Sequence, residues 1–190
     1  MGHLIHAILA SGNENKLREL GHALDGWSLE PLDADEYPPE DGTTYLDNAR
    51  GKAEFGRTLV TDRWVLGEDS GVEIDGLDGG PGVLSARWAA GCEAERALEE
   101  LEGIAGDGRR ARYVCELVAI SPDGAEHRAT GVLEGRIAEE MSGSEGFGFD
   151  PVFIPDGEER TVAELGNDWK RENSHRARAA RALRASIMPA

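Results

Sequence analysis

The sequence predicts an α/β fold with a mixed sheet, and three observations support this prediction. Segments whose apolar composition predicts strands alternate with segments whose apolar residues recur at helical spacing. Two strand-like segments late in the chain are joined by Pro-Asp-Gly, a turn sequence. The 190 residues, 39% of them hydrophobic, are enough to bury a core in one domain. We therefore expect a single domain over residues 1–190, and any second lobe would be inserted within it rather than appended.

Four segments in the first half of the chain carry secondary-structure signals. Residues 4–10 are apolar and are followed by Ser-Gly-Asn, which predicts a buried strand. Leucines recur at helical spacing within residues 14–24 and predict a helix. Residues 44–59 begin with Thr-x-x-Asp, a capping-box pattern, and predict a second helix. Residues 64–75 predict two strand pieces, separated by a break at residues 69–71.

The second half of the chain predicts two more helices and a hairpin. A short helix is expected over residues 93–102. Residues 111–121 and 127–139 predict strands, because both are rich in apolar residues and a turn sequence lies between them. A final helix is expected over residues 174–187. Strands and helices therefore alternate along the chain, as a mixed sheet flanked by helices requires.

The charge of the chain excludes several classes of function. Lys and Arg number 20 against 37 Asp and Glu, so the net charge is −17 and the pI is about 4.6. So acidic a surface repels nucleic-acid phosphates and anionic lipids. No apolar run is as long as a membrane span, and the first 14 residues lack the basic start of a signal peptide. We expect a cytoplasmic protein that binds neither nucleic acid nor membrane.

Most basic residues are arginines, and basic residues are concentrated near the end of the chain. Only three of them are lysines, a pattern that resembles proteins from salt-loving organisms, where salt screens the repulsion between carboxylates. The alternative is an ordinary acidic protein from a GC-rich genome, which also favours arginine. Residues 169–190 carry a net charge of +5, which indicates either an anion site or cations that complement a helix C-terminus.

The two cysteines do not indicate a metal site. Cys92 and Cys115 form no C-x-x-C pair and no metal-like cluster with the five histidines. Cys115 lies in an apolar stretch and is predicted to be a small core residue. A reduced, intracellular protein is expected.

Two segments of the first half carry residues suited to phosphate and metal chemistry. The segment Ser11-Gly12-Asn13-Glu14-Asn15-Lys16 lies between a predicted strand and a predicted helix, where free backbone N–H groups and a lysine can hold phosphate. The alternative is a helix N-cap made by Ser11 or Asn13. The segment Glu68-Asp69-Ser70-Gly71 follows an apolar run, so its acids would be partly desolvated and suited to bind a metal or act as a base. The alternative is a solvated turn.

Three later segments carry further candidate residues. The glycine-rich segment 79–87 indicates a structural loop or a close backbone approach to a ligand. In residues 143–151 glycines bracket two phenylalanines, which either stack on a planar base or fill the core. The segment Ser174-His175-Arg176 offers hydrogen-bond donors to carbonyl or phosphate oxygens, or is an N-cap followed by surface residues.

These motifs occur together in an order that resembles a known family. They are Ser-Gly-Asn-x-x-Lys (11–16), Asp-Asn-Ala-x-x-Lys-Ala (47–53), Glu-Asp-Ser-Gly (68–71), Gly-x-Pro-Gly-Val-x-Ser-Ala-Arg (79–87), Gly-Phe-Gly-Phe-Asp-Pro (146–151) and Ser-His-Arg (174–176). The set closely resembles the inosine/xanthosine triphosphate pyrophosphatase family, which hydrolyses non-canonical purine nucleotides. The resemblance runs from about Ile5 to Leu183.

The resemblance implies a fold and a reaction. The family fold is a long curved mixed sheet flanked by helices, in two lobes with a central nucleotide cleft, and the family is usually homodimeric. The implied reaction is hydrolysis of ITP, dITP or XTP to the monophosphate and pyrophosphate, with Mg²⁺ as cofactor, which serves to sanitise the nucleotide pool. The chain would then be a single nucleotide pyrophosphatase domain with a small-molecule nucleotide as its substrate.

The resemblance also implies a role for individual residues. For the triphosphate these are Ser11, Gly12, Asn13, Lys16, Asn48 and Lys52. For the base and ribose they are Phe147, Gly148, Phe149, Asp150, Lys170, His175 and Arg176, with Ser70 as a further substrate contact. Asp69 is implied to be the catalytic acid–base residue. The acids expected to hold the metal are Glu36, Glu68 and Asp69.

The donors at the end of the chain predict selectivity for keto purines. Hypoxanthine and xanthine present a 6-keto acceptor to His175 or Arg176, whereas adenine presents a donor and would leave those groups unpaired. Three other functions stay open: a related enzyme that clears modified pyrimidine or methylated nucleotides, a nucleotide sensor without catalysis, and a nucleic-acid-binding protein that uses the basic C-terminal helix.

Overall fold

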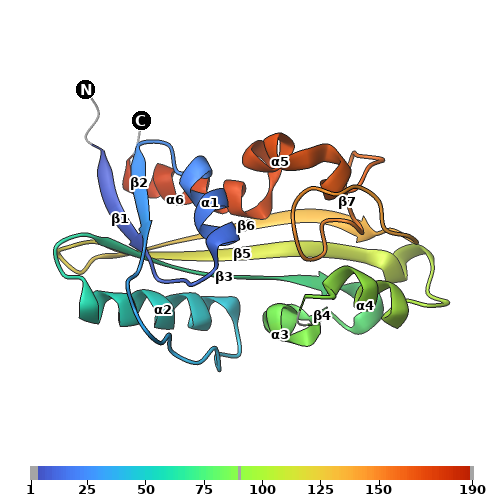
Figure 1. Cartoon of the computed structure of the whole chain (residues 1–190), viewed down its shortest axis with the longest axis horizontal. Coiled ribbons are helices and arrows are strands. Elements are labelled where there is room, and N and C mark those ends of the chain that lie inside the picture. The colour runs from blue at the N-terminus through green and yellow to red at the C-terminus, as the bar shows by residue number, and fades with distance from the viewer. Residues whose placement is uncertain (1–3, 90, 189–190) are drawn as a thin grey trace. The chain divides into compact units, whose positions relative to one another are not determined.

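A computed structural model describes residues 4–89 and 91–188 and has an α/β fold in which helices flank a seven-stranded sheet (Figure 1). The strands are β1 (Ile5–Leu9), β2 (Trp27–Pro31), β3 (Trp64–Ile74), β4 (Gly80–Pro81), β5 (Arg110–Ile120), β6 (Glu126–Ile137) and β7 (Phe153–Pro155). The α-helices are α1 (Glu14–Ala23), α2 (Tyr45–Leu59), α3 (Ser85–Ala89), α4 (Glu93–Glu100), α5 (Val162–Asn173) and α6 (His175–Ile187). Among the described residues, no helix combines the length and the apolar character needed to cross a membrane.

The sheet is mixed, as the sequence predicts. Its strand order is β2-β1-β3-β5-β6-β7, and the short strand β4 pairs with β3. Strand β1 runs parallel to both β2 and β3, whereas β4 runs antiparallel to β3 and β7 antiparallel to β6. Parallel neighbours require crossover connections, which α1 and α2 supply between β1, β2 and β3.

The chain divides into two compact units. Unit 1 comprises Met1–Asp69, Cys115–Gly131 and Arg176–Ala190, and unit 2 comprises Ser70–Val114 and Val132–His175. Strands β3, β5 and β6 each contribute residues to both units. Both segments of unit 2 lie between segments of unit 1 in the sequence. The single domain over residues 1–190 stays a prediction.

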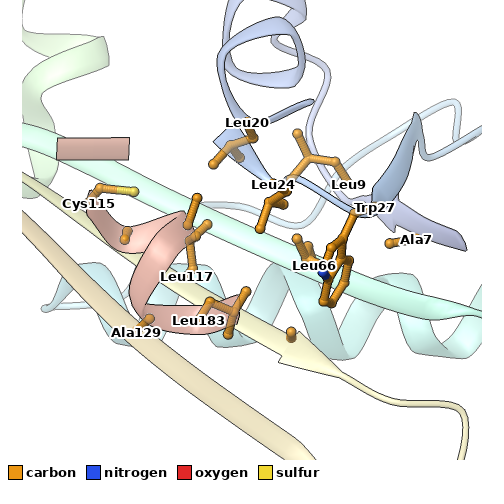
Figure 2. Packing of buried hydrophobic residues seen from close by; sticks show 13 residues of the cluster. Ala7, Leu9, Leu20, Leu24, Trp27, Leu66, Cys115, Leu117, Ala129 and Leu183 are labelled. Atoms are coloured by element: carbon orange, nitrogen blue, oxygen red, sulfur yellow. The ribbon is translucent and has the colours of Figure 1, made fainter. Parts of the chain in front are cut away.

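The core of unit 1 follows the alternation of side chains along its strands. In β1, Ala7 and Leu9 belong to one buried cluster, whereas Ile8 and Ala10 belong to another. Figure 2 shows the first cluster, to which helices α1 and α6 contribute leucines. Its other labelled members are Leu20, Leu24, Trp27, Leu66, Cys115, Leu117, Ala129 and Leu183. The prediction that Cys115 is a core residue is confirmed.

Within unit 1, helix α2 packs closely on the sheet because its contact face is made of small residues. Its Ala49 and Ala53 are fully buried against Val118 and Ile120 of β5. The helix begins with the predicted capping box, in which the Thr44 and Asp47 side chains accept hydrogen bonds from each other's backbone N–H groups. Because this box fixes where the first turn starts, it also fixes which α2 side chains face β3.

Unit 2 has a core of its own. It contains Ile74 of β3, Leu101 after α4 and Phe153 of β7, all fully buried. Helix α5 begins with a second capping box, formed by Thr161 and Glu164. In unit 2, Figure 1 shows α5 on one side of the strands and α3 and α4 on the other.

The prediction of a strand break at residues 69–71 is wrong. Strand β3 runs without interruption from Trp64 to Ile74. Lys16 and Lys52 pair with Glu68 and Asp69, so the two acids lie inside a strand without a turn to expose them. The other predicted strands and helices are confirmed to within a few residues, whereas the sequence did not indicate β2, β4, α3, α5 and β7.

The glycine-rich segment 79–87 serves a structural role. It forms β4, a 3₁₀ turn over Gly82–Leu84 and the start of α3. The Ser85 hydroxyl accepts a hydrogen bond from the Val72 amide at 2.9 Å and donates one to the Gly82 carbonyl at 2.6 Å. These bonds fix the segment to strand β3.

Candidate active site

The loop before α1 is organised by a helix cap. Asn13 is the N-cap, and its Oδ1 accepts hydrogen bonds from the amides of Asn15 at 3.0 Å and Lys16 at 3.2 Å. The Ser11 hydroxyl accepts a hydrogen bond from the Asn13 amide at 3.2 Å. The cap places Lys16 in the first turn, where its Nζ lies 2.7 Å from Glu68 Oε2. Gly12 and Asn13 are exposed.

Glu68 is fully buried in a network of charges within unit 1. Besides Lys16, it pairs with Arg176, whose Nε lies 3.1 Å from Glu68 Oε1. Arg176 in turn places Nη1 3.0 Å from Glu19 Oε2. Burial alone would raise the pKa of Glu68, but Lys16, Arg176 and Lys52 outweigh it and hold that pKa well below its ordinary range. Glu68 is therefore ionised at neutral pH.

The surroundings of Asp69 shift its pKa in the opposite direction to that of Glu68. It is 3% exposed, its Oδ2 accepts a hydrogen bond from Asn48 Nδ2 at 2.9 Å, and its Oδ1 lies 3.5 Å from Lys52 Nζ. Burial raises the pKa of Asp69 above its ordinary value, although Lys52 and Asn48 act against this. A raised pKa makes this carboxylate a stronger base than an exposed aspartate.

Lys52 connects Asp69 to a loop acid. Its Nζ donates to the Glu68 carbonyl at 3.0 Å and forms an ion pair with Glu40. Burial lowers the pKa of Lys52, but Asp69, Glu68 and Glu40 together raise it above its ordinary value. No sequence motif indicates Glu40. Glu36, the acid expected here, is exposed.

The close packing of α2 on β3 brings Asn48 and Lys52 to Asp69. A Cβ atom added to Gly67 would lie 1.9 Å from the Ala49 carbonyl oxygen, so only glycine permits the observed approach of the two elements. Asn48 is held from the other side, because its Oδ1 accepts a hydrogen bond from the Gly42 amide at 2.9 Å. One turn of α2 thus presents two polar side chains to one carboxylate.

In unit 2 the predicted base-binding residues gather around Asp150. This carboxylate is 4% exposed, and its Oδ2 accepts hydrogen bonds from Lys170 Nζ at 2.7 Å and from the Phe147 amide at 2.8 Å. Lys170 also lies over the Phe147 ring, with Nζ 4.6 Å from the ring centroid. The turn needs a glycine at Gly146, where φ is +82° and Asp150 fills the space of a side chain.

The two phenylalanines of this loop differ in exposure. Phe149 is buried and stacks on Trp88 at a centroid distance of 6.1 Å, so it fills the core of unit 2. Phe147 is half-buried, as are Gly148 and Ser70. His175 is 4% exposed and stacks on Tyr113, with 4.6 Å between the ring centroids and 7° between the ring planes.

Comparison with known proteins identifies the family of this chain. The model of the Ham1 family matches residues 7–186. The chain belongs to the Ham1 family. This confirms the resemblance inferred from the motifs, because curated relatives that are 40–41% identical to this chain carry the name dITP/XTP pyrophosphatase.

Ham1 relatives cover nearly the whole chain. The dITP/XTP pyrophosphatase of Deinococcus deserti is 41% identical over 183 residues, which are 94% of this chain and 88% of the relative. That of Bdellovibrio bacteriovorus is 40% identical over 186 residues, 92% of this chain and 94% of the relative. The solved structure of a HAM1 protein from Coxiella burnetii matches with a TM-score of 0.84 and 33% identity, over 98% of this chain and 100% of that one.

Sequence reasoning about this Ham1 chain found most of the clustered residues and missed three. Within unit 1 the structure brings Lys16, Asn48, Lys52, Glu68 and Asp69 together, and within unit 2 it brings Phe147, Asp150, Lys170 and His175 together. The missed residues are Glu19, Glu40 and Tyr113. Glu19 follows Lys16 by one helical turn, a spacing that is common on exposed helix faces and carries no signal by itself.

The acids of this Ham1 chain have donor chemistry that fits magnesium. Among the described residues, no three His, Cys, Asp or Glu side chains form a ready metal cage. Magnesium rarely uses such a cage, because it prefers one or two carboxylates together with water and substrate phosphate oxygens. Asp69 and Glu40, which both contact Lys52, supply oxygen donors of that kind.

Proposed function

We propose that the protein hydrolyses the triphosphates of non-canonical purine nucleosides, ITP, dITP and XTP, to the monophosphate and pyrophosphate. The observation that carries this proposal is the setting of Asp69, a nearly buried carboxylate oriented by Asn48 and Lys52. The relatives named dITP/XTP pyrophosphatase support the same substrates.

Asp69 would act as the general base on the attacking water. A base works best when its pKa approaches the working pH, and burial shifts the pKa of Asp69 in that direction. The oxygen of the water bonds to the α-phosphorus, and the proton of the water passes to Asp69. The bond from the α-phosphorus to the oxygen that bridges to the β-phosphate breaks. Pyrophosphate then leaves with the electrons of the broken bond.

The lysines of unit 1 would bind the polyphosphate. A triphosphate carries about four negative charges near neutral pH, so cations must offset them before a nucleophile can approach. Lys16 and Lys52 are each oriented by a carboxylate, and the half-buried Ser11 and the exposed Gly12 and Asn13 lie beside the start of α1. Glu68 anchors Lys16 and would keep it in place.

Magnesium would be held by Asp69 and Glu40. The other two acids that the resemblance implies as metal ligands are Glu68, which precedes Asp69 in β3, and the exposed Glu36. When bound, Mg²⁺ offsets phosphate charge and polarises the phosphoryl oxygens.

The polar groups of unit 2 would recognise the purine base through hydrogen bonds. Lys170 and His175 offer donors, which suit the 6-keto group of hypoxanthine or xanthine. The amino group of adenine is itself a donor, so each protein donor left unpaired costs about 1–3 kcal/mol. Phe147 offers a half-buried ring for stacking. Arg176 belongs to the same expected set, although its contacts with Glu68 and Glu19 favour a structural role.

The proposal includes a homodimer as the assembled state, on the resemblance to the family. Light scattering coupled to size-exclusion chromatography measures this directly. A mass of about twice the chain mass of 20.5 kDa is expected.

A nucleotide panel tests the proposed activity. Wild-type protein with Mg²⁺ should release pyrophosphate, and no free phosphate, from ITP and XTP, while ATP and GTP should be poor substrates and EDTA should abolish turnover. Asp69→Asn should lower turnover by about 10²–10⁴-fold, because it removes the general base. The matched control is Asp62→Asn, an exposed aspartate of unit 1, which should keep wild-type turnover. Release of free phosphate, or a fast Asp69→Asn enzyme, would contradict the proposal.

A further inference from the structure

Tyr113 lies where β5 passes through unit 2 and contacts two members of the proposed base-binding set, His175 and Asp150. It is 7% exposed. One face of its ring stacks on His175, and its hydroxyl donates a hydrogen bond to Asp150 Oδ1 at 3.2 Å. Phe153 also packs against the ring at a centroid distance of 4.4 Å. Neither the motifs nor the family resemblance assigned any role to Tyr113.

The hydroxyl of Tyr113 is the feature that needs an explanation. A core position of this kind is well filled by phenylalanine, and a buried hydroxyl destabilises the fold unless it is hydrogen-bonded. Here the hydroxyl bonds to the carboxylate whose other oxygen holds Lys170 and the Phe147 amide. Tyr113 therefore fixes the rotation of the Asp150 carboxylate, and through it the position of the Lys170 ammonium.

The ring of Tyr113 acts on a second donor. Rings that lie nearly parallel, at 7° and 4.6 Å, leave the imidazole of His175 little freedom to tilt. One side chain thus orients both His175 and, through Asp150, Lys170.

We propose that Tyr113 is a positioning residue that sets the selectivity for keto over amino purines, by holding the donors of His175 and Lys170 in a fixed relative arrangement. This inference rests on the proposed function, because it assigns those two donors to the base. Tyr113 itself does not need to contact the substrate.

The test is Tyr113→Phe, which keeps the ring and removes the hydroxyl. We expect the ratio of kcat/KM for ITP to kcat/KM for ATP to fall by about 10- to 100-fold, the effect of one lost hydrogen bond to a charged group. The change should lie in KM for ITP, with kcat within about two-fold of wild type, because the catalytic carboxylate of unit 1 is untouched. Tyr113→Leu, which also removes the stacked ring, should lower the ratio further.

A packing control separates positioning from stability. Phe153→Leu removes a second aromatic neighbour of Tyr113, and it should lower the melting temperature while the ITP-to-ATP ratio stays at the wild-type value. An unchanged ratio in Tyr113→Phe, or an equal loss in Phe153→Leu, would overturn the inference.

Binding measurements keep the inference separate from the proposed function. In an Asp69→Asn background, calorimetry with ITP and ATP reports base preference without turnover. A preference for ITP that Tyr113→Phe reduces supports the inference even if wild-type protein releases no pyrophosphate, which would by itself overturn the proposed function. No preference for ITP over ATP in the Asp69→Asn background would overturn the inference.

Discussion

Glu68 and Asp69 are neighbours in the sequence, yet their surroundings lower the pKa of Glu68 and raise the pKa of Asp69. Successive side chains of a strand point to opposite faces, so the two carboxylates meet different partners. Two cations at hydrogen-bond distance, Lys16 and Arg176, more than offset the burial of Glu68, whereas burial prevails at Asp69. Glu68 is therefore suited to anchor charged side chains, and Asp69 is suited to accept a proton.

The low pKa of Glu68 predicts how stability depends on pH. An acid whose pKa is lower in the folded than in the unfolded protein stabilises the fold above its unfolded pKa, about 4.3, and this stabilisation is lost as pH falls toward the folded pKa. Glu68→Gln should lower the free energy of unfolding by about 3–5 kcal/mol at pH 7, because the nearly buried Lys16 and the buried Arg176 each lose an ion pair. The deficit should shrink below about pH 4. Urea titrations of both proteins between pH 3 and pH 8 measure it.

A surface ion pair supplies the control for that measurement. Glu126 pairs with Arg50 at 3.0 Å, and both side chains are about one-third exposed. Glu126→Gln should therefore change stability by no more than about 1 kcal/mol at any pH. A Glu68→Gln deficit that stays constant down to pH 3 would show that packing, and not charge, makes the contribution.

At the scale of elements, the contact between α2 and β3 determines the geometry around Asp69. The side chain of Asn48 and that of Lys52 lie one turn apart on α2, and both reach Asp69 because the helix backbone approaches Gly67 closely. A Cβ at this position would meet the Ala53 amide at 2.7 Å as well as the Ala49 carbonyl. Backbone atoms cannot rotate away as a side chain can, so the whole helix would have to shift.

Gly67→Ala should therefore lower activity more than its effect on stability explains. We expect overpacking to lower the free energy of unfolding by about 1–3 kcal/mol. Displacement of Asn48 and Lys52 from Asp69 should lower kcat by at least about 10-fold at temperatures where the variant is fully folded.

The same helix offers a control with the same chemical change. Gly51 lies in α2 where an added Cβ meets no atom within 4 Å, so Gly51→Ala should raise stability by up to about 1 kcal/mol and leave kcat unchanged. Wild-type kcat in Gly67→Ala would show that close packing of α2 does not determine the site.

Sequence predicted those elements whose signals are local. The Thr44-x-x-Asp47 box and the Pro-Asp-Gly turn predict α2 and the β5–β6 hairpin, because a cap and a turn need only residues a few positions apart. Thr161-x-x-Glu164 carries the same signal for α5, but Gly166, two residues further on, has a non-helical backbone conformation within this helix. The continuity of β3 depends on Lys16 and Lys52, which lie far away in the sequence.

The residues of the candidate site also fall into those that have a local sequence signal and those that have none. Motif spacing indicated Lys16, Asn48, Lys52 and Asp69, whose side chains converge in unit 1. Glu19, Glu40 and Tyr113 have no local signal, because each owes its role to a partner that only the fold brings near. Glu19, for example, is separated by 157 positions from Arg176.

At the scale of the whole molecule, the three lysines are all placed in the candidate sites. Lys16, Lys52 and Lys170 are nearly buried, and each pairs with a carboxylate. Every other formally positive side chain is an arginine, so the exposed surface of the described residues carries no lysine. The basic C-terminal segment is partly neutralised in the same way, because Arg184 pairs with Asp25 and Arg176 with Glu68.

A net charge of −17 on a chain of 190 residues predicts a dependence of stability on salt. Repulsion between exposed carboxylates opposes folding, and its range falls from about 10 Å at 0.1 M salt to about 3 Å at 1 M. If the composition is an adaptation to salt, the melting temperature should rise by several degrees between 0.1 M and 2 M KCl, with pyrophosphate release following it. If the composition instead reflects a GC-rich genome, screening of attractive arginine–carboxylate pairs should offset the relief of repulsion, and the melting temperature should stay flat or fall. Melting curves in KCl, repeated in sucrose as an uncharged stabiliser, distinguish the two, because charge screening requires ions whereas solute exclusion does not.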